Sequence, residues 1–183
     1  MDNKKLTAIF IYADGFEDTE AIASRDVLVR AGFQIYDYVL NPNGEVNSSH
    51  GMKFIGDHTN ELPLADVVVL PGGSRGVQNL LKSNWVDEMI QNHYKNGKLV
   101  CAICAAPMVL GKNGLLKGLP FTCYPGCEEG LDGVYTGNEV VVTDRIITAR
   151  SMLYSIPFGL AIIEKMMGKE KRELIYKQIA GIR

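Results

Sequence analysis

The chain has 183 residues, of which 46% are hydrophobic and 22% are charged, as in ordinary globular proteins. Its net charge of −2 comes from interspersed acidic and basic residues, so we expect neither nucleic acid nor a membrane surface as a partner. No repeat, linker or low-complexity tract divides the sequence, and we assign residues 1–183 to one domain. The N-terminal apolar run is too short for a leader or a spanning helix, and four cysteines suggest no disulfide scaffold, which together favour a cytoplasmic protein.

Apolar runs and helical patterns alternate along the chain. Continuous apolar runs predict buried strands at 6–12, 33–40, 65–70 and 99–103. Helical patterns are found at 17–31, 77–81, 85–95, 105–110, 155–167 and 169–179. Shorter strands are predicted at 120–123, 139–143 and 145–149, the last two pairing across a tight turn, and a weak hairpin at 45–55.

This alternation predicts an α/β fold, with a mostly parallel sheet covered by helices on both faces. In such sheets the functional site lies at the carboxyl ends of the strands. Three breaks in the pattern should therefore meet there, at 13–20, at 71–76 and at Cys104.

Cys104 is the candidate nucleophile. A buried strand runs into it and a short helix follows, with small residues, Ala102 and Ala106, two positions away on each side. This is the pattern of a nucleophile elbow, with a thiol in place of the hydroxyl. The start of the following helix should favour the thiolate form. The alternative is a cysteine that only fills the core.

The neighbouring breaks supply candidate partners for the sulfur. Backbone N–H groups of Ala105 and of the Gly72-Gly73 turn suit a developing oxyanion, although that turn is also a plain strand end. Glu20, on the first turn of a helix, can face inward; beside a thiolate it should be protonated and able to move a proton. Nearby Glu17 is explained as favourable charge at a helix start.

Other chemistry is less well supported. His93 is predicted on the surface, and His50 and His58 in loops, so a cysteine–histidine pair requires the fold to bring in a loop histidine. The spacing of the four cysteines resembles that of a zinc site. However, Cys101 and Cys104 lie in an apolar strand without the glycine-rich turn that usually surrounds zinc-binding cysteines, so we expect no metal. Cys123 and Cys127 are core or loop thiols, or approach Cys104 and resolve its oxidised form.

Taken together, the residues at these breaks resemble those of the ThiJ/PfpI family. This family has a flavodoxin-like fold, a three-layer sandwich, which it shares with class I glutamine amidotransferase domains. The branch linked to Parkinson disease, described as deglycases, glyoxalases and redox chaperones, is most similar. The resemblance runs nearly end to end and rests on four stretches: ADGFEDTE with DVLVRAG at 13–32, DVVVLPGG at 66–73, AICAAP at 102–107, and TAR at 148–150 with AIIE at 161–164.

By resemblance, Cys104 is the oxidisable family cysteine, Glu20 the carboxyl bonded to it, and Gly73 and Ala105 the backbone donors. Arg150 matches a residue at the pocket edge. The branch has a histidine where this chain has Tyr124, a poor base because its ordinary pKa is about 10, although its hydroxyl can still donate a hydrogen bond to a substrate.

The protease-like members have a histidine directly after the cysteine. Here that residue is Ala105, which disfavours a peptidase. The resemblance thus implies an enzyme without cofactors that acts on 2-oxoaldehydes or glycated adducts, or alternatively a redox sensor or chaperone that works through Cys104. A thiamine-biosynthesis role has no separate support. The resemblance also implies a homodimer with the helix near Glu17 at its interface.

Overall fold

The computed structural model describes residues 5–182; residues 1–4 and 183, part of the assigned domain, lie outside the described chain. The strands are β1 (Thr7–Tyr12), β2 (Gln34–Val39), β3 (Glu45–Asn47), β4 (Lys53–Ile55), β5 (Val67–Leu70), β6 (Leu99–Ile103), β7 (Pro120–Phe121), β8 (Val134–Tyr135), β9 (Val140–Val142) and β10 (Ile146–Ala149). The helices are α1 (Asp18–Ala31), α2 (Ser74–Leu80), α3 (Asn84–Lys95), α4 (Pro107–Lys112), α5 (Ser155–Met167) and α6 (Lys169–Ala180), with a 3₁₀ turn η1 (Met152–Tyr154).

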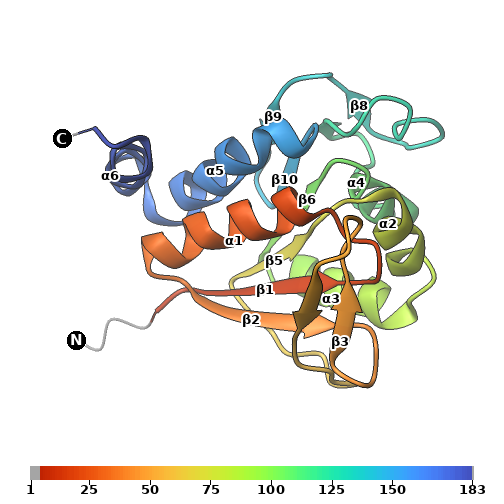
Figure 1. Cartoon of the computed structure of the whole chain (residues 1–183). Coiled ribbons are helices and arrows are strands. Elements are labelled where there is room, and N and C mark those ends of the chain that lie inside the picture. Colours follow the sequence, from red (N-terminus) through yellow and green to blue (C-terminus); the bar gives the residue numbers. More distant parts are fainter. Residues whose placement is uncertain (1–4, 183) are drawn as a thin grey trace.

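A six-stranded sheet in the order β2-β1-β5-β6-β10-β9 forms the centre of the molecule (Figure 1). All neighbouring strands are parallel except β9, which runs antiparallel to β10 at one edge. The fold is therefore the α/β, flavodoxin-like fold that the sequence predicts. The predicted pairing of the two short strands before α5 is also confirmed.

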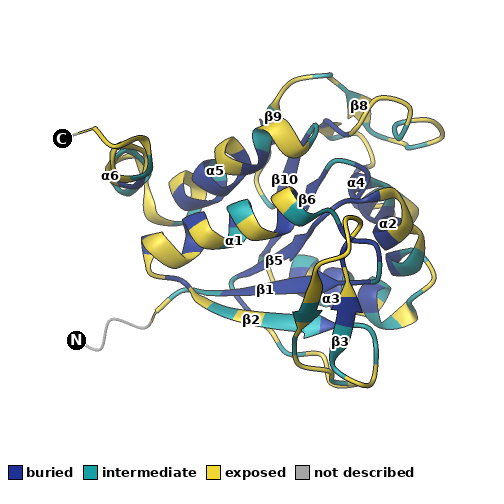
Figure 2. Cartoon of the chain, viewed as in Figure 1, coloured by how far each residue is buried: buried dark blue, intermediate teal, exposed yellow. Residues whose placement is uncertain are grey.

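Helices cover both faces of this sheet. Alternate side chains of β1 and β5 pack on one side against α1 and α5, and on the other side against α2, α3 and α4. Strands β5 and β6 are buried at every residue, which explains their lack of a polar face. Figure 2 shows the buried strands between helices whose outer surfaces are exposed.

Short-range signals set the ends of α1. The Glu17 carboxylate accepts a hydrogen bond from the Glu20 N–H at 2.7 Å and caps the first turn. Gly32 ends the helix in a left-handed conformation, with φ of 100°, that favours glycine. The cap at Glu17 sets where the first turn of α1 begins, and thus where Glu20 lies on the helix.

The predicted 45–55 hairpin is confirmed and forms as β3 and β4. The differences from the predicted elements are local. Helix α4 begins at Pro107 and not at residue 105, because residues 104–106 form the turn that follows β6. Strand β8, which pairs with β7, was not predicted, since two residues leave no periodic signal. Within residues 5–182, no helix has the length and apolar character needed to cross a membrane.

Candidate active site

Cys104 lies on a strained turn between β6 and α4. Its φ of 63° is the only positive value at a non-glycine residue in the described chain. Such a conformation costs about 1–2 kcal/mol and persists where neighbours fix it. Here the Cys104 N–H donates to Ala149 O at 2.9 Å, and the Cys104 carbonyl accepts from the Tyr124 N–H at 2.8 Å. The main chain therefore holds the thiol at the carboxyl end of the sheet.

Gly72 allows a close approach between Cys104 and Glu20. A Cβ atom at Gly72 would lie 2.5 Å from Glu20 Oε2 and 2.7 Å from Cys104 Cβ. Gly73 has φ of 92°, and its Cβ would lie 2.4 Å from Gly15 O. Two consecutive positions without side chains thus bring the ends of β1, β5 and β6 together, as the three sequence breaks predict.

The Glu20 carboxyl is completely buried. Its Oε2 accepts a hydrogen bond from the Gly72 N–H at 2.8 Å, and within the described residues Oε1 has no hydrogen-bond partner. Burial is the main reason that the pKa of Glu20 is raised from 4.5 to about 7; Cys104 acts against it, the nearby charge of Glu17 adds to it, and the Gly72 N–H lowers it slightly. The carboxyl is therefore largely protonated below neutral pH.

Burial also raises the pKa of the Cys104 thiol, and the charge of Glu20 adds to this increase. The N–H groups of Ala105 and Gly73 act in the opposite direction, but their effect is smaller. The start of the helix acts in the predicted direction, since the Ala105 N–H favours the thiolate, but burial outweighs it in the net pKa. Each negative charge disfavours the other, so Glu20 and Cys104 share a single charge once their first proton is lost.

Cys104 opens into a cleft of about 560 Å³. The residues that line it are Glu17, Ser49, Gly73, Ser74, Val77, Gln78, Cys104, Ala105, Met108, Tyr124, Gly126 and Cys127. Several of these were not singled out from the sequence, although Ser74 and Gln78 lie four positions apart on α2 and so share one helical face. None of the lining residues is a lysine, arginine or histidine, and most of the exposed lining is apolar.

Tyr124 and Arg150 are placed differently. Tyr124 lines the cleft with its side chain about half exposed. Arg150 is not among the lining residues: its guanidinium donates to Gly137 O at 2.9 Å and stacks on the Tyr154 ring at 4.9 Å. Arg150 therefore fastens the segment before β9 to the start of α5, and does not stand at the edge of this cleft.

The histidines do not reach Cys104. His50 binds the Asp18 carboxylate at 2.9 Å on the protein surface. The prediction that His93 is exposed is wrong, because His93 is fully buried, accepts from the Ala65 N–H at 3.1 Å and donates to Met89 O at 2.8 Å. Its position in a polar stretch of sequence hid this role.

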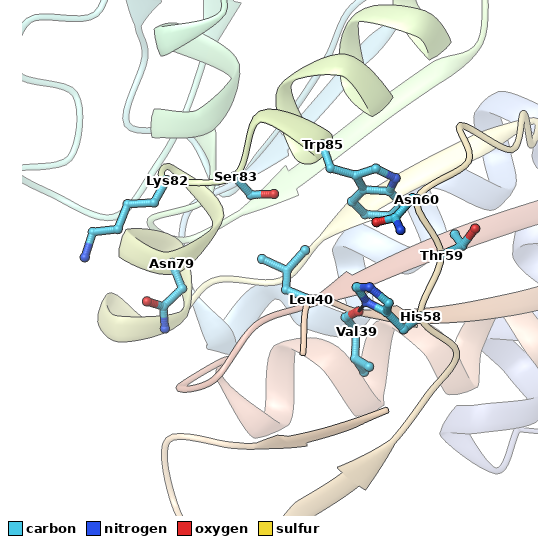
Figure 3. A pocket seen from close by; sticks show the side chains of 9 residues that line it. All are labelled: Val39, Leu40, His58, Thr59, Asn60, Asn79, Lys82, Ser83 and Trp85. Atoms are coloured by element: carbon cyan, nitrogen blue, oxygen red, sulfur yellow. Dashed lines mark hydrogen bonds between the residues drawn. The ribbon is translucent and has the colours of Figure 1, made fainter. Parts of the chain in front are cut away.

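His58 lines a second, separate cavity of about 280 Å³ (Figure 3). Its Nδ1 lies 3.1 Å from Val39 O, and the cavity shares no residue with the Cys104 cleft. Its lining residues are Val39, Leu40, His58, Thr59, Asn60, Asn79, Lys82, Ser83 and Trp85.

The four cysteines do not converge on one point. Cys101 is buried in the core on one face of the sheet, and Cys123 is buried on the other. All four are free thiols. Cys127 is partly exposed and, unlike Cys101 and Cys123, faces the same cleft as Cys104.

A cysteine held in a strained turn between a buried strand and a helix, at the carboxyl end of a parallel sheet, defines an α/β protein with a nucleophile elbow. The particular family follows from comparison with known proteins. The model of the DJ-1/PfpI family matches residues 6–165, and the chain belongs to this family and, within it, to the DJ-1 branch.

Relatives cover nearly the whole chain. Drosophila melanogaster dj-1beta is 36% identical over 178 residues, which cover 93% of this chain and 95% of the relative. The Caenorhabditis elegans glutathione-independent glyoxalase DJR-1.2 is 28% identical over 184 residues, 98% of each chain. The structure of oxidized Toxoplasma gondii DJ-1 superposes with a TM-score of 0.89 at 29% identity, covering 96% of this chain and 98% of the other.

Proposed function

We propose that the protein is a cysteine-dependent glyoxalase, which converts small 2-oxoaldehydes such as methylglyoxal into 2-hydroxy acids without glutathione or a cofactor. The observation that carries the proposal is the buried Glu20 carboxyl, placed beside an elbow cysteine that opens into a cleft. The name of the Caenorhabditis elegans relative supports the same reaction.

The first step uses Cys104 as the nucleophile. Its thiol proton passes to Glu20, whose pKa near 7 suits a group that both accepts and returns a proton. The sulfur then attacks the aldehyde carbon, and the carbonyl π electrons move to the oxygen. The N–H groups of Gly73 and Ala105, which already lie against the sulfur, are available to the new oxyanion.

The second step moves hydrogen between the two substrate carbons. Glu20 returns the thiol proton to the oxyanion, and its carboxylate then removes the proton from the former aldehyde carbon, so that an enediolate forms. Glu20 delivers this proton to the neighbouring carbon while the hydroxyl proton of the first carbon passes to the former ketone oxygen, which gives a Cys104 thioester. One carbon has then been oxidised and the other reduced, so no external redox partner is needed. Water hydrolyses the thioester, releasing the 2-hydroxy acid and the thiol.

Tyr124 is proposed to position the substrate. Its hydroxyl can donate a hydrogen bond to the ketone oxygen from the mouth of the cleft. Because no histidine lines the cleft, proton transfer in this scheme falls to Glu20. The same scheme extends to early sugar adducts on amines or thiols: the hemiaminal or hemithioacetal first releases its amine or thiol, and Cys104 then attacks the aldehyde carbon so formed.

Turnover tests the proposal. Wild type should consume methylglyoxal and release lactate without glutathione, and Cys104→Ala should lose at least about a thousandfold of the rate. Cys123→Ala, which removes a buried thiol outside the cleft, should keep most of it. Full activity in Cys104→Ala, or no lactate from wild type, would exclude this function.

A redox sensor that works through Cys104 is the second candidate. It is favoured by one observation on a relative, the Toxoplasma gondii DJ-1 whose structure is of the oxidized protein. Two results together would support the redox sensor over the glyoxalase. Peroxide should add oxygen selectively to Cys104, and the protein should not turn over methylglyoxal.

We also propose that the protein is a cytoplasmic homodimer. Four free thiols are compatible with a reducing compartment. Ile22 of α1 and Met152, Leu153 and Ile156 near the start of α5 expose large apolar side chains, and Leu153 is 75% exposed. Sedimentation of wild type as a dimer, and of Leu153→Asp as a monomer, would support the dimer; a monomeric wild type would exclude it.

A further inference from the structure

Cys127 is a nucleophilic group that the proposed glyoxalase mechanism does not use. Its side chain lines the same cleft as Cys104, and both thiols are partly exposed. The other two cysteines are fully buried and line no part of that cleft. The described chain therefore presents two thiols to one cleft.

The segment that carries Cys127 is attached to Cys104 itself. The Tyr124 N–H donates to the Cys104 carbonyl at 2.8 Å, and the Cys127 N–H donates to Tyr124 O at 2.9 Å. Pro125 and Gly126, with φ of 93° at Gly126, complete a type II turn, which keeps Tyr124 and Cys127 within about 7 Å of each other. A Cβ at Gly126 would meet no atom within 4 Å, so this turn has room to adjust.

Cys123, which directly precedes this turn, is not exposed. It is buried, and its sulfur lies 3.9 Å from Glu128 Oε2. Burial, followed by the charges of Cys127 and Glu128, raises the pKa of Cys123 to about 12. Burial and Glu128 also raise the pKa of Cys127. Burial raises the pKa of all three thiols, and Cys104 differs in that the N–H groups of Ala105 and Gly73 act on its sulfur and partly offset this increase.

We propose that Cys127 is a resolving cysteine, and that peroxide converts the two cleft thiols into a Cys104–Cys127 disulfide. In the first step the Cys104 sulfur attacks one oxygen of hydrogen peroxide, the O–O bond breaks, and the sulfur becomes a sulfenic acid as water leaves. In the second step the Cys127 sulfur attacks the Cys104 sulfur and the S–O bond breaks. The departing hydroxide takes the Cys127 proton and leaves as water.

This disulfide closes the cleft reversibly. It occupies the Cys104 sulfur that the elbow presents, so any chemistry of that thiol stops until a dithiol reductant restores it. It also consumes the sulfenic acid before further peroxide converts it to the sulfinic acid, which thiols do not reduce. The inference concerns the redox chemistry of Cys104 and holds whether or not the protein turns over aldehydes.

Mass spectrometry of the full chain tests the proposal. Reduced protein is treated with a few equivalents of hydrogen peroxide, free thiols are alkylated, and peptides are mapped without reduction. The expected product within one chain is a Cys104–Cys127 linked peptide, with loss of two hydrogens. Cys127→Ser should abolish it and increase the Cys104 sulfinic acid roughly tenfold. Cys123→Ser, the matched control, should form the disulfide as wild type does.

Three outcomes would overturn the inference: Cys104 sulfinic acid forming equally in wild type and Cys127→Ser, a disulfide from Cys104 to Cys123, or a disulfide found only between chains. The wild-type peptide map shows by itself whether the Cys104–Cys127 disulfide forms, so this result does not depend on the folding of any variant. Glyoxalase turnover in reductant is measured separately, so failure of either idea is visible without the other.

Discussion

Replacing Glu20 by Gln probes the buried carboxyl in isolation. The amide has nearly the same shape, and its oxygen can accept the Gly72 N–H as Glu20 Oε2 does. The change therefore removes one titration and leaves the packing of the site in place. Since Glu20 is completely buried, that titration is coupled to the free energy of unfolding.

The size of the effect follows from the pKa of Glu20, which burial raises from 4.5 to about 7. At about 1.4 kcal/mol for each pH unit, this increase corresponds to about 3 kcal/mol. The native protein holds the proton more tightly than the unfolded chain. Its stabilising effect is thus complete below about pH 4.5 and is lost as the pH rises through about 7. Between about pH 5 and pH 8 the loss amounts to about 2 to 3 kcal/mol.

Urea denaturation of wild type and Glu20→Gln across this range measures the difference directly, because titrating groups that do not interact with Glu20 contribute equally to both proteins. We expect the variant to gain about 2 to 3 kcal/mol relative to wild type from about pH 5 to pH 8. Glu88→Gln, an exposed glutamate on α3, is the matched control and should show no such trend. A flat difference for Glu20→Gln would refute the reasoning that burial raises this pKa.

Three further outcomes follow from the geometry. Gly72→Ala introduces a Cβ that clashes with Glu20 and Cys104, and should cost about 2 kcal/mol in urea denaturation and most of the turnover; normal activity would contradict this contact. His93→Ala leaves the Ala65 N–H without an acceptor, and should lower the stability by about 3 kcal/mol while kcat in the folded protein is unchanged. Because no cationic residue lines the cleft, the anionic aldehyde glyoxylate should show a kcat/KM at least about tenfold below that of methylglyoxal; a higher value would contradict the electrostatic argument.

The sequence predicted the central sheet because its strands carry their own signal. β5 and β6 are short apolar runs buried at every residue, and the breaks after them are glycine, proline and the elbow cysteine. β8 was missed because two residues set by a long-range pairing leave no local pattern. His93 was misplaced for a related reason, since its partners lie in a distant loop and on its own helix.

The candidate site was predictable where the main chain decides the geometry. The turn at Cys104 and the approach of Gly72 follow from residue sizes along the sequence. The balance of charge was not predictable, because burial outweighs the helix start and raises the pKa of the Cys104 thiol. The place of Arg150 depends on Gly137 and Tyr154, which no local pattern connects to it.

Alkylation of Cys104 tests the central claim of a cysteine nucleophile most directly. Wild type is treated with rising amounts of iodoacetamide, and the alkylated fraction of each cysteine is read from peptide maps while lactate formation is measured on the same samples. We predict that the activity lost equals the alkylated fraction of Cys104 and reaches zero when that residue is fully modified. Lactate formation that survives complete modification of Cys104 would contradict the account.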